Sequence, residues 1–339
     1  MNTPKLIRLI NKTGATVCLT DIGAAVVAVT VPDKNGCMAD VALGYKNIDD
    51  YMNDSPCSGK IVGRYANRIA GAKICIDGKE YILDKNDGEN CNHSGRASFA
   101  NRLWTLTEIS ENMARFELIS PDGDGGFPGK VRVSACYEWH DDNSLCLSLT
   151  ARTTATTVIN LTNHTYWNLS GHNSGSIFDH VLKLESTHYL PSLPDFIPTG
   201  EIAPVSGTPM DFTAPKAVGR DIDVPFPDIT QGRGYNSCWV IDKYEKGILS
   251  LNATLSDPVS GRILRVYSSQ PGVQVYTGGW LDDSPVNKAM RRYRNFDGIA
   301  LECQDFPDAP HHSRFPSTLL HPGETYKRQI VYRFGIEAL

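Results

Sequence analysis

The chain has 339 residues, of which 41% are hydrophobic, and a formal net charge of -5. A chain of this size can bury a large core, either as two ordinary domains or as one large all-β domain. Its 33 Lys and Arg residues are spread along the sequence, so there is no basic tract to bind a nucleic-acid backbone or an anionic membrane surface. Composition therefore argues against nucleic-acid and membrane-surface partners.

Two further features bear on location and redox state. The opening residues 1–8 contain no apolar signal-peptide core, and no later stretch approaches the roughly 18 apolar residues that would span a bilayer. The nine cysteines include no C-x-x-C pair, which argues against a disulfide framework and against a zinc site. We therefore expect a cytoplasmic protein with reduced thiols.

Strand signals follow one another along the chain, separated by Gly, Pro, Asn and Asp residues that suit turns. β-branched residues or alternating patterns predict three hairpins, over residues 17–30, 73–83 and 131–154. Further strands are predicted over residues 157–166, 263–269, 272–278 and 329–334. The pattern is all-β.

Helical periodicity is weak and confined to residues 48–52 and 287–294. Strands and helices do not alternate as they would in a parallel α/β sheet. The Pro-rich residues 191–215 predict a long ordered loop rather than a domain boundary. One large β-sandwich domain is the simplest interpretation.

Four polar clusters stand beside turns or strands, where loops commonly carry function. They cover residues 63–68, 90–95, 162–169 and 301–310. Together they supply Arg, two His, Glu, Asn, Gln and the aromatic Trp167, an inventory suited to an uncharged polyhydroxylated ligand such as a carbohydrate. Spacing alone cannot bring the four clusters together in space.

Several of these residues have a simpler structural interpretation. An isolated His or Arg is more often a satisfied structural group than a catalyst. Asp305 and Asp308 are expected only to shape a turn. Residues 122–126 resemble part of a calcium loop but lack its remaining ligands and distal Glu, so we predict no metal site.

In this order, the four clusters resemble the aldose 1-epimerase (galactose mutarotase) family. The similarity runs nearly end to end and includes residues 31–33, 40–45, 120–129, 270–278 and 321–326, with 163–169 and 301–304 the most specific. It implies a single domain over residues 1–339, a large antiparallel β-supersandwich with few short helices. It also implies a concave sugar site without metal or coenzyme, in a monomer or homodimer.

Carried over by motif, the resemblance makes Glu302 the general base and His164 the general acid. It implies that the hydroxyls of a free aldohexose, galactose or glucose, bind to Asn67, Arg68, His93, Asn236 and Gln274. The implied reaction interconverts the α and β anomers by opening and closing the sugar ring. For this reaction we expect neighbouring charges to keep Glu302 ionised and His164 protonated. The alternative for Arg68 is a structural arginine tied to loop carbonyls.

The sequence departs from the family pattern at several positions. Trp167 replaces Phe, residues 92–95 replace Leu-His-Gly-Gly, and His311 stands where Asn is common. Most consequential is Asn236, which replaces an Asp that accepts hydrogen bonds from the sugar. Because an amide is neutral and both donates and accepts, the preferred sugar is in question.

Two alternatives stay open at this point. A hexose-6-phosphate 1-epimerase could use Arg291, Arg292 and Arg294 as a phosphate clamp, although these arginines also suit the solvated face of a short helix. A non-catalytic sugar-binding module on the same scaffold is the second, because fold does not fix function. A glycoside hydrolase would need a second positioned carboxylate, for which Asp305 and Asp308 are poorly placed.

Overall fold

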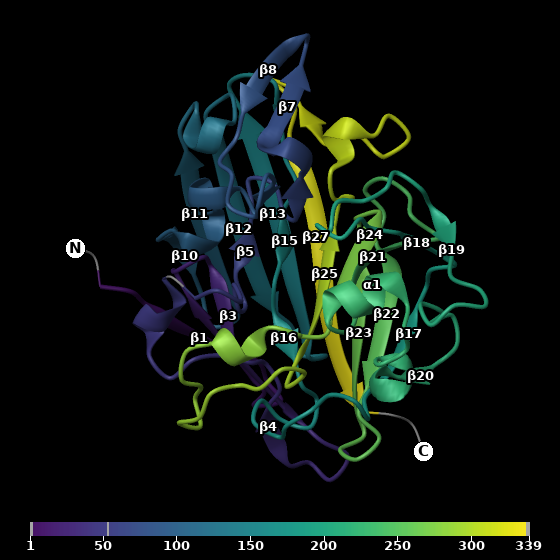
Figure 1. Cartoon of the computed structure of the whole chain (residues 1–339). Helices are drawn as coiled ribbons and strands as arrows, with labels where there is room; N and C mark the ends of the chain where they lie inside the picture. Colours follow the sequence, from purple (N-terminus) through teal and green to yellow (C-terminus); the bar gives the residue numbers. More distant parts are fainter. Residues whose placement is uncertain (1–2, 53, 337–339) are drawn as a thin grey trace.

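The computed structural model describes residues 3–52 and 54–336, and antiparallel strands dominate it. The ends of the predicted domain, residues 1–2 and 337–339, lie outside the described part. The largest sheet has nine strands, and Figure 1 shows it continuing from β10–β13 through the yellow β27 into β23, β22 and β17. In spatial order its strands are β10 (Thr105–Ile109), β11 (Met113–Ser120), β12 (Val131–Trp139), β13 (Ser144–Thr153), β27 (Tyr326–Ile336), β23 (Arg262–Ser268), β22 (Ser250–Ser256), β17 (Val181–Leu184) and β20 (Lys216–Ala217).

A second sheet of six strands carries much of the candidate site. Its order is β16 (Tyr166–Trp167), β25 (Ile299–Gln304), β24 (Gly272–Tyr276), β21 (Asn236–Val240), β18 (His188–Leu190) and β19 (Ala203–Pro204). A four-stranded sheet at the N-terminal end contains β1 (Leu6–Ile10), β2 (Thr16–Thr20), β3 (Ala25–Pro32) and β4 (Met38–Asp40). Short pairs complete the fold: β5 (Ile61–Val62) with β15 (Thr162–Asn163), β6 (Arg68–Ile69) with β9 (Cys91–Asn92), β7 (Lys73–Ile76) with β8 (Lys79–Ile82), and β14 (Thr157–Val158) with β26 (Leu319–Leu320).

Helical structure is sparse. Within the described residues there is one α-helix, α1 (Pro227–Gly232), and none of the helices there is long and apolar enough to cross a membrane. The 3-10 turns are η1 (Ile48–Tyr51), η2 (Ala70–Ala72), η3 (Gly95–Ala97), η4 (Phe99–Asn101), η5 (Asp124–Gly126), η6 (Val218–Asp221), η7 (Leu281–Asp283) and η8 (Ala309–His311). The all-β prediction is confirmed.

Alternation along the strands builds the core. In β13, the side chains of Leu145, Leu147 and Leu149 are fully buried, whereas the residues between them are only half-buried. Because successive side chains of a strand point to opposite faces, one face of this strand packs inward. The resulting hydrophobic cluster includes residues from Ile7 to Phe334, and thus joins the two ends of the described chain.

The three predicted hairpins are confirmed as the antiparallel pairs β2–β3, β7–β8 and β12–β13. The single strand expected over residues 157–166 is instead split into β14, β15 and the start of β16. The side chain of Asn160 explains the first break, because it bonds to the backbone of two other segments, at Ala66 and Asp305.

The helix expected over residues 287–294 is wrong, because this segment forms turns closed by a bridge between Val286 and Arg292. The side-chain oxygen of Asn287 accepts the backbone N–H groups of Ala289 and Arg291. Such side-chain bonds compete with the helical ladder for the same donors. Local polar chemistry has therefore overridden a weak helical pattern.

Candidate active site

A cavity of about 380 Å³ opens beside the six-stranded sheet. Three neighbouring strands contribute to it, with Asn236 at the start of β21, Gln274 in β24 and Glu302 in β25. Loops and the short strands β6, β9 and β16 supply its other polar side chains. The cavity brings together all seven residues predicted from the sequence, Asn67, Arg68, His93, His164, Asn236, Gln274 and Glu302.

Glu302 lies deep in this cavity on a strand that is buried along its whole length. It is paired in register with Gln274 on the neighbouring strand, so the two side chains are on the same face of the sheet. Burial raises the pKa of the Glu302 carboxyl to about 8, against a smaller opposing effect of the Arg68 charge. Its Oε2 is buried and has no hydrogen-bond partner among the residues that the structure describes. The other oxygen is directed at a histidine.

His164 lies between β15 and β16, with its Nε2 3.4 Å from Oε1 of Glu302. Its backbone is fixed on both sides, because its N–H donates to the carbonyl of Lys60 and its carbonyl accepts the N–H of Gly59, each at 2.9 Å. The imidazole packs against Tyr166, with ring centroids 5.0 Å apart. Both members of the candidate catalytic pair are therefore held on hydrogen-bonded backbone.

Burial also lowers the pKa of His164, to about 4, and the ammonium of Lys60 lowers it further. Lys60 is fully buried in an ion pair with Asp54, so this charge is a fixed part of the surroundings. The expectation that the site keeps Glu302 ionised and His164 protonated is therefore wrong for this structure. Desolvation disfavours both charged forms, and the neutral pair is favoured.

Arg68 forms part of the cavity wall at the start of β6. Its Nε donates to Oδ2 of Asp87 at 2.7 Å, and its guanidinium lies 4.5 Å from the ring centre of Phe196. The alternative of a structural arginine tied to loop carbonyls does not describe it, since its side chain contacts a carboxylate and an aromatic ring. Asn67 holds the same loop by accepting the N–H of Arg68 on its own Oδ1. The Arg68 side chain is 13% exposed, and these contacts hold its guanidinium at the cavity wall.

His93 is a neutral hydrogen-bond donor in this arrangement. Its Nδ1 accepts the backbone N–H of Asn67 at 3.0 Å, which places the ring proton on Nε2. Burial lowers the pKa of His93 well below its usual range, and the charges of His164 and Arg68 act in the same direction. His93 therefore suits binding of a sugar hydroxyl better than it suits acid catalysis.

Asn236 and Gln274 form an amide pair. The Nε2 of Gln274 donates to Oδ1 of Asn236 at 2.9 Å. This contact uses the Asn236 acceptor and leaves its NH₂ group as a donor, while the Gln274 carbonyl remains an acceptor. The position where an Asp would only accept thus presents a donor to the cavity.

The aromatic side chains of the site were missed by sequence reasoning. Trp167 is fully buried against Tyr332 and Phe334 and does not line the cavity. The aromatic surface is formed instead by Tyr276 and Trp280, whose rings stack with centroids 6.2 Å apart. Tyr166 and Phe196 also line the cavity. Tyr166 and Tyr276 lie within the family-like segments 162–169 and 270–278, so these segments already pointed to the two tyrosines.

This geometry agrees with comparisons to known proteins. A model of the family described as aldose 1-epimerase matches residues 5–333. The chain belongs to the aldose 1-epimerase family. The prediction from the sequence motifs is therefore confirmed at the level of the family.

Named relatives cover nearly the whole chain. A galactose mutarotase from Rattus norvegicus is 38% identical over 314 residues, which are 93% of this chain and 89% of the rat protein. An aldose 1-epimerase from Escherichia coli is 30% identical over 335 residues, 98% of this chain and 96% of the bacterial protein. The crystal structure of an aldose epimerase homologue from C. elegans superimposes with a TM-score of 0.91 at 30% identity, covering 99% of this chain and all of that one. The fold therefore matches the β-supersandwich of the aldose epimerases.

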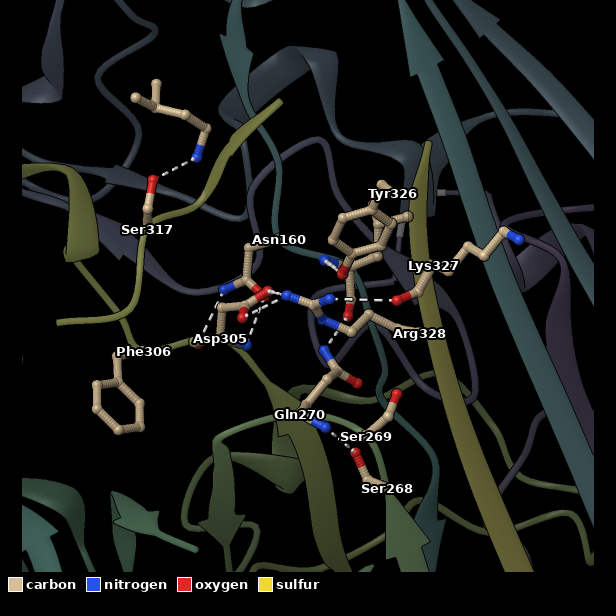
Figure 2. Close-up of polar contacts among 12 residues, drawn as sticks. Asn160, Ser268, Ser269, Gln270, Asp305, Phe306, Ser317, Tyr326, Lys327 and Arg328 are labelled. Carbon is tan, nitrogen blue, oxygen red and sulfur yellow. Dashed lines mark hydrogen bonds and ion pairs between the residues drawn. The ribbon is translucent and has the colours of Figure 1, made fainter. Parts of the chain in front are cut away.

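Asp305 and Asp308, expected only to shape a turn, have larger roles. Asp305 is fully buried, and Figure 2 shows it between Arg328, which bonds to both carboxylate oxygens, and Asn160, which bonds to its backbone. Asp308 donates its N–H to the carbonyl of Arg68 and accepts from the ring of His311 at 2.6 Å. The turn after Glu302 is thus anchored to the loop that carries Arg68.

The remaining motifs lie away from the candidate active-site cavity. Arg291, Arg292 and Arg294 do not line it, so the structure gives no support for their use as a phosphate clamp on the reacting sugar. In the 122–126 segment, Asp124 pairs with Arg102 at 2.7 Å. Residues 3–52 and 54–336 contain no cluster of three or more His, Cys, Asp or Glu side chains arranged to hold a metal ion.

Proposed function

We propose that the protein interconverts the α and β anomers of a free aldohexose, galactose or glucose, with Glu302 as general base and His164 as general acid. The observation that carries this proposal is the facing pair itself, 3.4 Å apart and buried in a cavity lined with groups that bind hydroxyls. Membership of the aldose 1-epimerase family supports the reaction.

The reaction needs only proton movement. Glu302 takes the proton of the anomeric hydroxyl while His164 protonates the ring oxygen, and the ring opens to the aldehyde. Rotation about the C1–C2 bond presents the other face of the carbonyl. The same two groups, with their roles reversed, then close the ring to the opposite anomer.

Burial of the pair favours the opening step. When the ring opens, Glu302 has gained a proton and His164 has lost one, so an ion pair becomes a neutral pair. The raised pKa of Glu302 and the lowered pKa of His164 both stabilise that neutral arrangement. Proton transfer that starts from the ion pair and ends with the neutral pair is therefore favourable, while the ion pair is the less populated form of the free site. The positive charge of Arg68 acts in the other direction and keeps the ionised form of Glu302 accessible.

The cavity wall supplies sugar binding. Nε2–H of His93, the guanidinium of Arg68 and the amide of Asn236 are donors for sugar oxygens, and the Gln274 carbonyl is an acceptor for a hydroxyl hydrogen. The stacked rings beside them, Tyr276 and Trp280, can pack against the C–H face of a pyranose. A neutral polyhydroxylated ring matches this mixture better than a charged ligand does.

Three further properties belong to this proposal. A single domain over residues 1–339 is supported by the hydrophobic cluster that joins Ile7 to Phe334. We retain the expectation of a cytoplasmic protein. For its assembly we retain a monomer or homodimer.

Polarimetry of freshly dissolved α-D-galactose and α-D-glucose tests the proposal. The protein should accelerate the approach of the optical rotation to equilibrium, and Glu302→Gln should remove most of this acceleration. Sugar binding without any acceleration by the wild-type protein would instead identify a non-catalytic sugar-binding module. Acceleration confined to the 6-phosphate of either sugar would identify a hexose-6-phosphate 1-epimerase.

A further inference from the structure

A second cavity, of about 460 Å³, is lined by three arginines that the catalytic site does not use. It lies between the loop of residues 173–175 and the turns of residues 291–297, and no residue lines both this cavity and the catalytic one. We propose that this arginine cavity binds a phosphate group, as the free ion or as a small phosphate monoester. The proposal does not depend on the mutarotase function.

The charge of the arginine cavity favours an anionic ligand. The residues lining the arginine cavity include Arg291, Arg292 and Arg294, and Asp297 is the one carboxylate among those that the structure describes. Three positive charges against one negative charge leave a local excess of two. A phosphate monoester carries roughly -1.5 to -2 charges at neutral pH, so the charges are complementary. The excess is notable in a chain whose net charge is -5.

Neutral oxygens orient two of the guanidinium groups of the arginine cavity. Arg291 donates from Nε to the Asn173 side chain at 2.9 Å and from Nη2 to the Asn173 carbonyl at 3.0 Å. Arg292 donates from Nη1 to the carbonyl of Ser284 at 2.9 Å. Carbonyl and amide oxygens fix a guanidinium without neutralising it, and each Arg has five N–H donors, so donors remain for a ligand.

The carboxylate of Asp297 already accepts a hydrogen bond from the backbone of the turn. Its Oδ2 accepts the N–H of Arg294 at 2.8 Å. Burial raises the pKa of the Asp297 carboxyl, while Arg294 and Arg291 act against that rise. The carboxylate therefore shapes the turn that presents Arg294.

The side chain of Asn168, which does not line the arginine cavity, connects the two walls of the cavity by hydrogen bonds. The side-chain NH₂ of Asn168 donates to the carbonyl of Gly175 at 2.7 Å and to the carbonyl of Asp297 at 2.9 Å. Gly175 and Asp297 both line the cavity, one on each wall. A cavity whose walls are pre-positioned loses less entropy when a ligand binds, which favours a small ligand over a flat protein surface.

Isothermal titration with inorganic phosphate and with glycerol 2-phosphate tests this inference, at an ionic strength matched with potassium chloride. Both titrations should be saturable, and tighter binding of glycerol 2-phosphate would identify a monoester as the ligand class. Arg294→Met and Arg291→Met should each weaken binding by roughly tenfold, the loss of one charge-assisted hydrogen bond. Arg314→Met, which removes an exposed arginine outside the cavity, is the matched control and should bind like wild type.

Three results would overturn the proposal. The first is the absence of saturable binding to the wild-type protein. The second is wild-type affinity in the Arg291→Met/Arg294→Met double variant. The third is displacement of bound phosphate by saturating galactose, because that would place the anion at Arg68 in the catalytic cavity. The mutarotation rate of each variant serves as the folding check, since Arg291 and Arg294 do not line the catalytic cavity.

Discussion

The proposed catalytic floor, Glu302 and His164, and the proposed binding wall, Asn67, Arg68, His93 and Asn236, share one cavity but are built differently. The floor rests on central strands and fixed backbone, and burial shifts the pKa of both its groups. In the wall, loop and strand-end residues are already hydrogen-bonded to one another. In the proposed function, desolvation prepares proton transfer, whereas hydrogen bonding prepares sugar recognition. Changes in the floor should therefore act on kcat, and changes in the wall on KM.

The largest effect is expected at the floor. Glu302→Gln keeps the shape of the side chain but removes the base, so kcat should fall by roughly 10²-fold or more, the usual contribution of one general acid–base group. Polarimetry at saturating sugar measures it. A Gln variant with a rate near that of wild type would contradict the assignment of Glu302.

A second change in the floor tests the partner. His164→Asn should also lower kcat by about 10²-fold, because the ring oxygen loses its proton donor. The pH dependence should change as well, since Glu302 alone then titrates and the residual rate should rise in a single step as Glu302 ionises. A bell-shaped profile that persists would indicate another acid, with His93 the first suspect.

A change in the wall should act differently. Asn236→Asp keeps the acceptor that Gln274 uses but replaces the exposed amide donor with a charged acceptor. We expect KM for galactose or glucose to fall by about five- to thirty-fold, the equivalent of about 1–2 kcal/mol per hydroxyl contact, with little change in kcat. A collapse of kcat would instead place Asn236 in the proton-transfer machinery, and no change for any common aldose would place it outside the sugar site.

The smallest effect concerns stability. A carboxyl with a raised pKa in the folded state, here from 4.5 to about 8, stabilises the fold below its unfolded pKa and loses this contribution as pH rises toward 8. A comparison of wild type with Glu302→Gln isolates this contribution, because the other titrating groups, His164 included, are present in both proteins.

The free energy of unfolding of Glu302→Gln, compared with that of wild type, should consequently rise by roughly 2 kcal/mol as the pH increases from 6.5 to 8, at about 1.4 kcal/mol per pKa unit. Denaturant unfolding at both pH values measures this difference in unfolding free energy, and Glu138→Gln, at an exposed position, is the control. A difference in unfolding free energy that does not change with pH would contradict the raised pKa of Glu302.

Local features of the sequence were sufficient for much of the fold. The hairpin of β12 and β13 follows from alternation on both sides of a turn, and its register matches that alternation. The failed helix at residues 287–294 depended on the side chain of Asn287, whose bonds to the backbone no periodicity reveals. Helical spacing predicts structure only where local polar groups do not compete for the backbone.

The site could be predicted less directly. Residues as far apart as Asn67 and Glu302 meet only through the packing of the sheets, so the motifs of the family, rather than spacing, identified them. The aromatic surface was assigned to Trp167, which is in the core, because a sequence does not show which aromatic faces a cavity. The direction of the Glu302 and His164 pKa shifts was missed for the same reason, since both arise from burial.

The pH dependence of wild-type mutarotation tests the account most directly. If Glu302 and His164 share one working proton, the polarimetric kcat/KM should follow a bell, with an acidic limb near the His164 pKa of about 4 and a basic limb near the Glu302 pKa of about 8. Below the first limb the pair has no base, and above the second it has no acid. A rate that is flat from pH 4 to pH 9, or a bell unchanged in both Glu302→Gln and His164→Asn, would contradict the central claim.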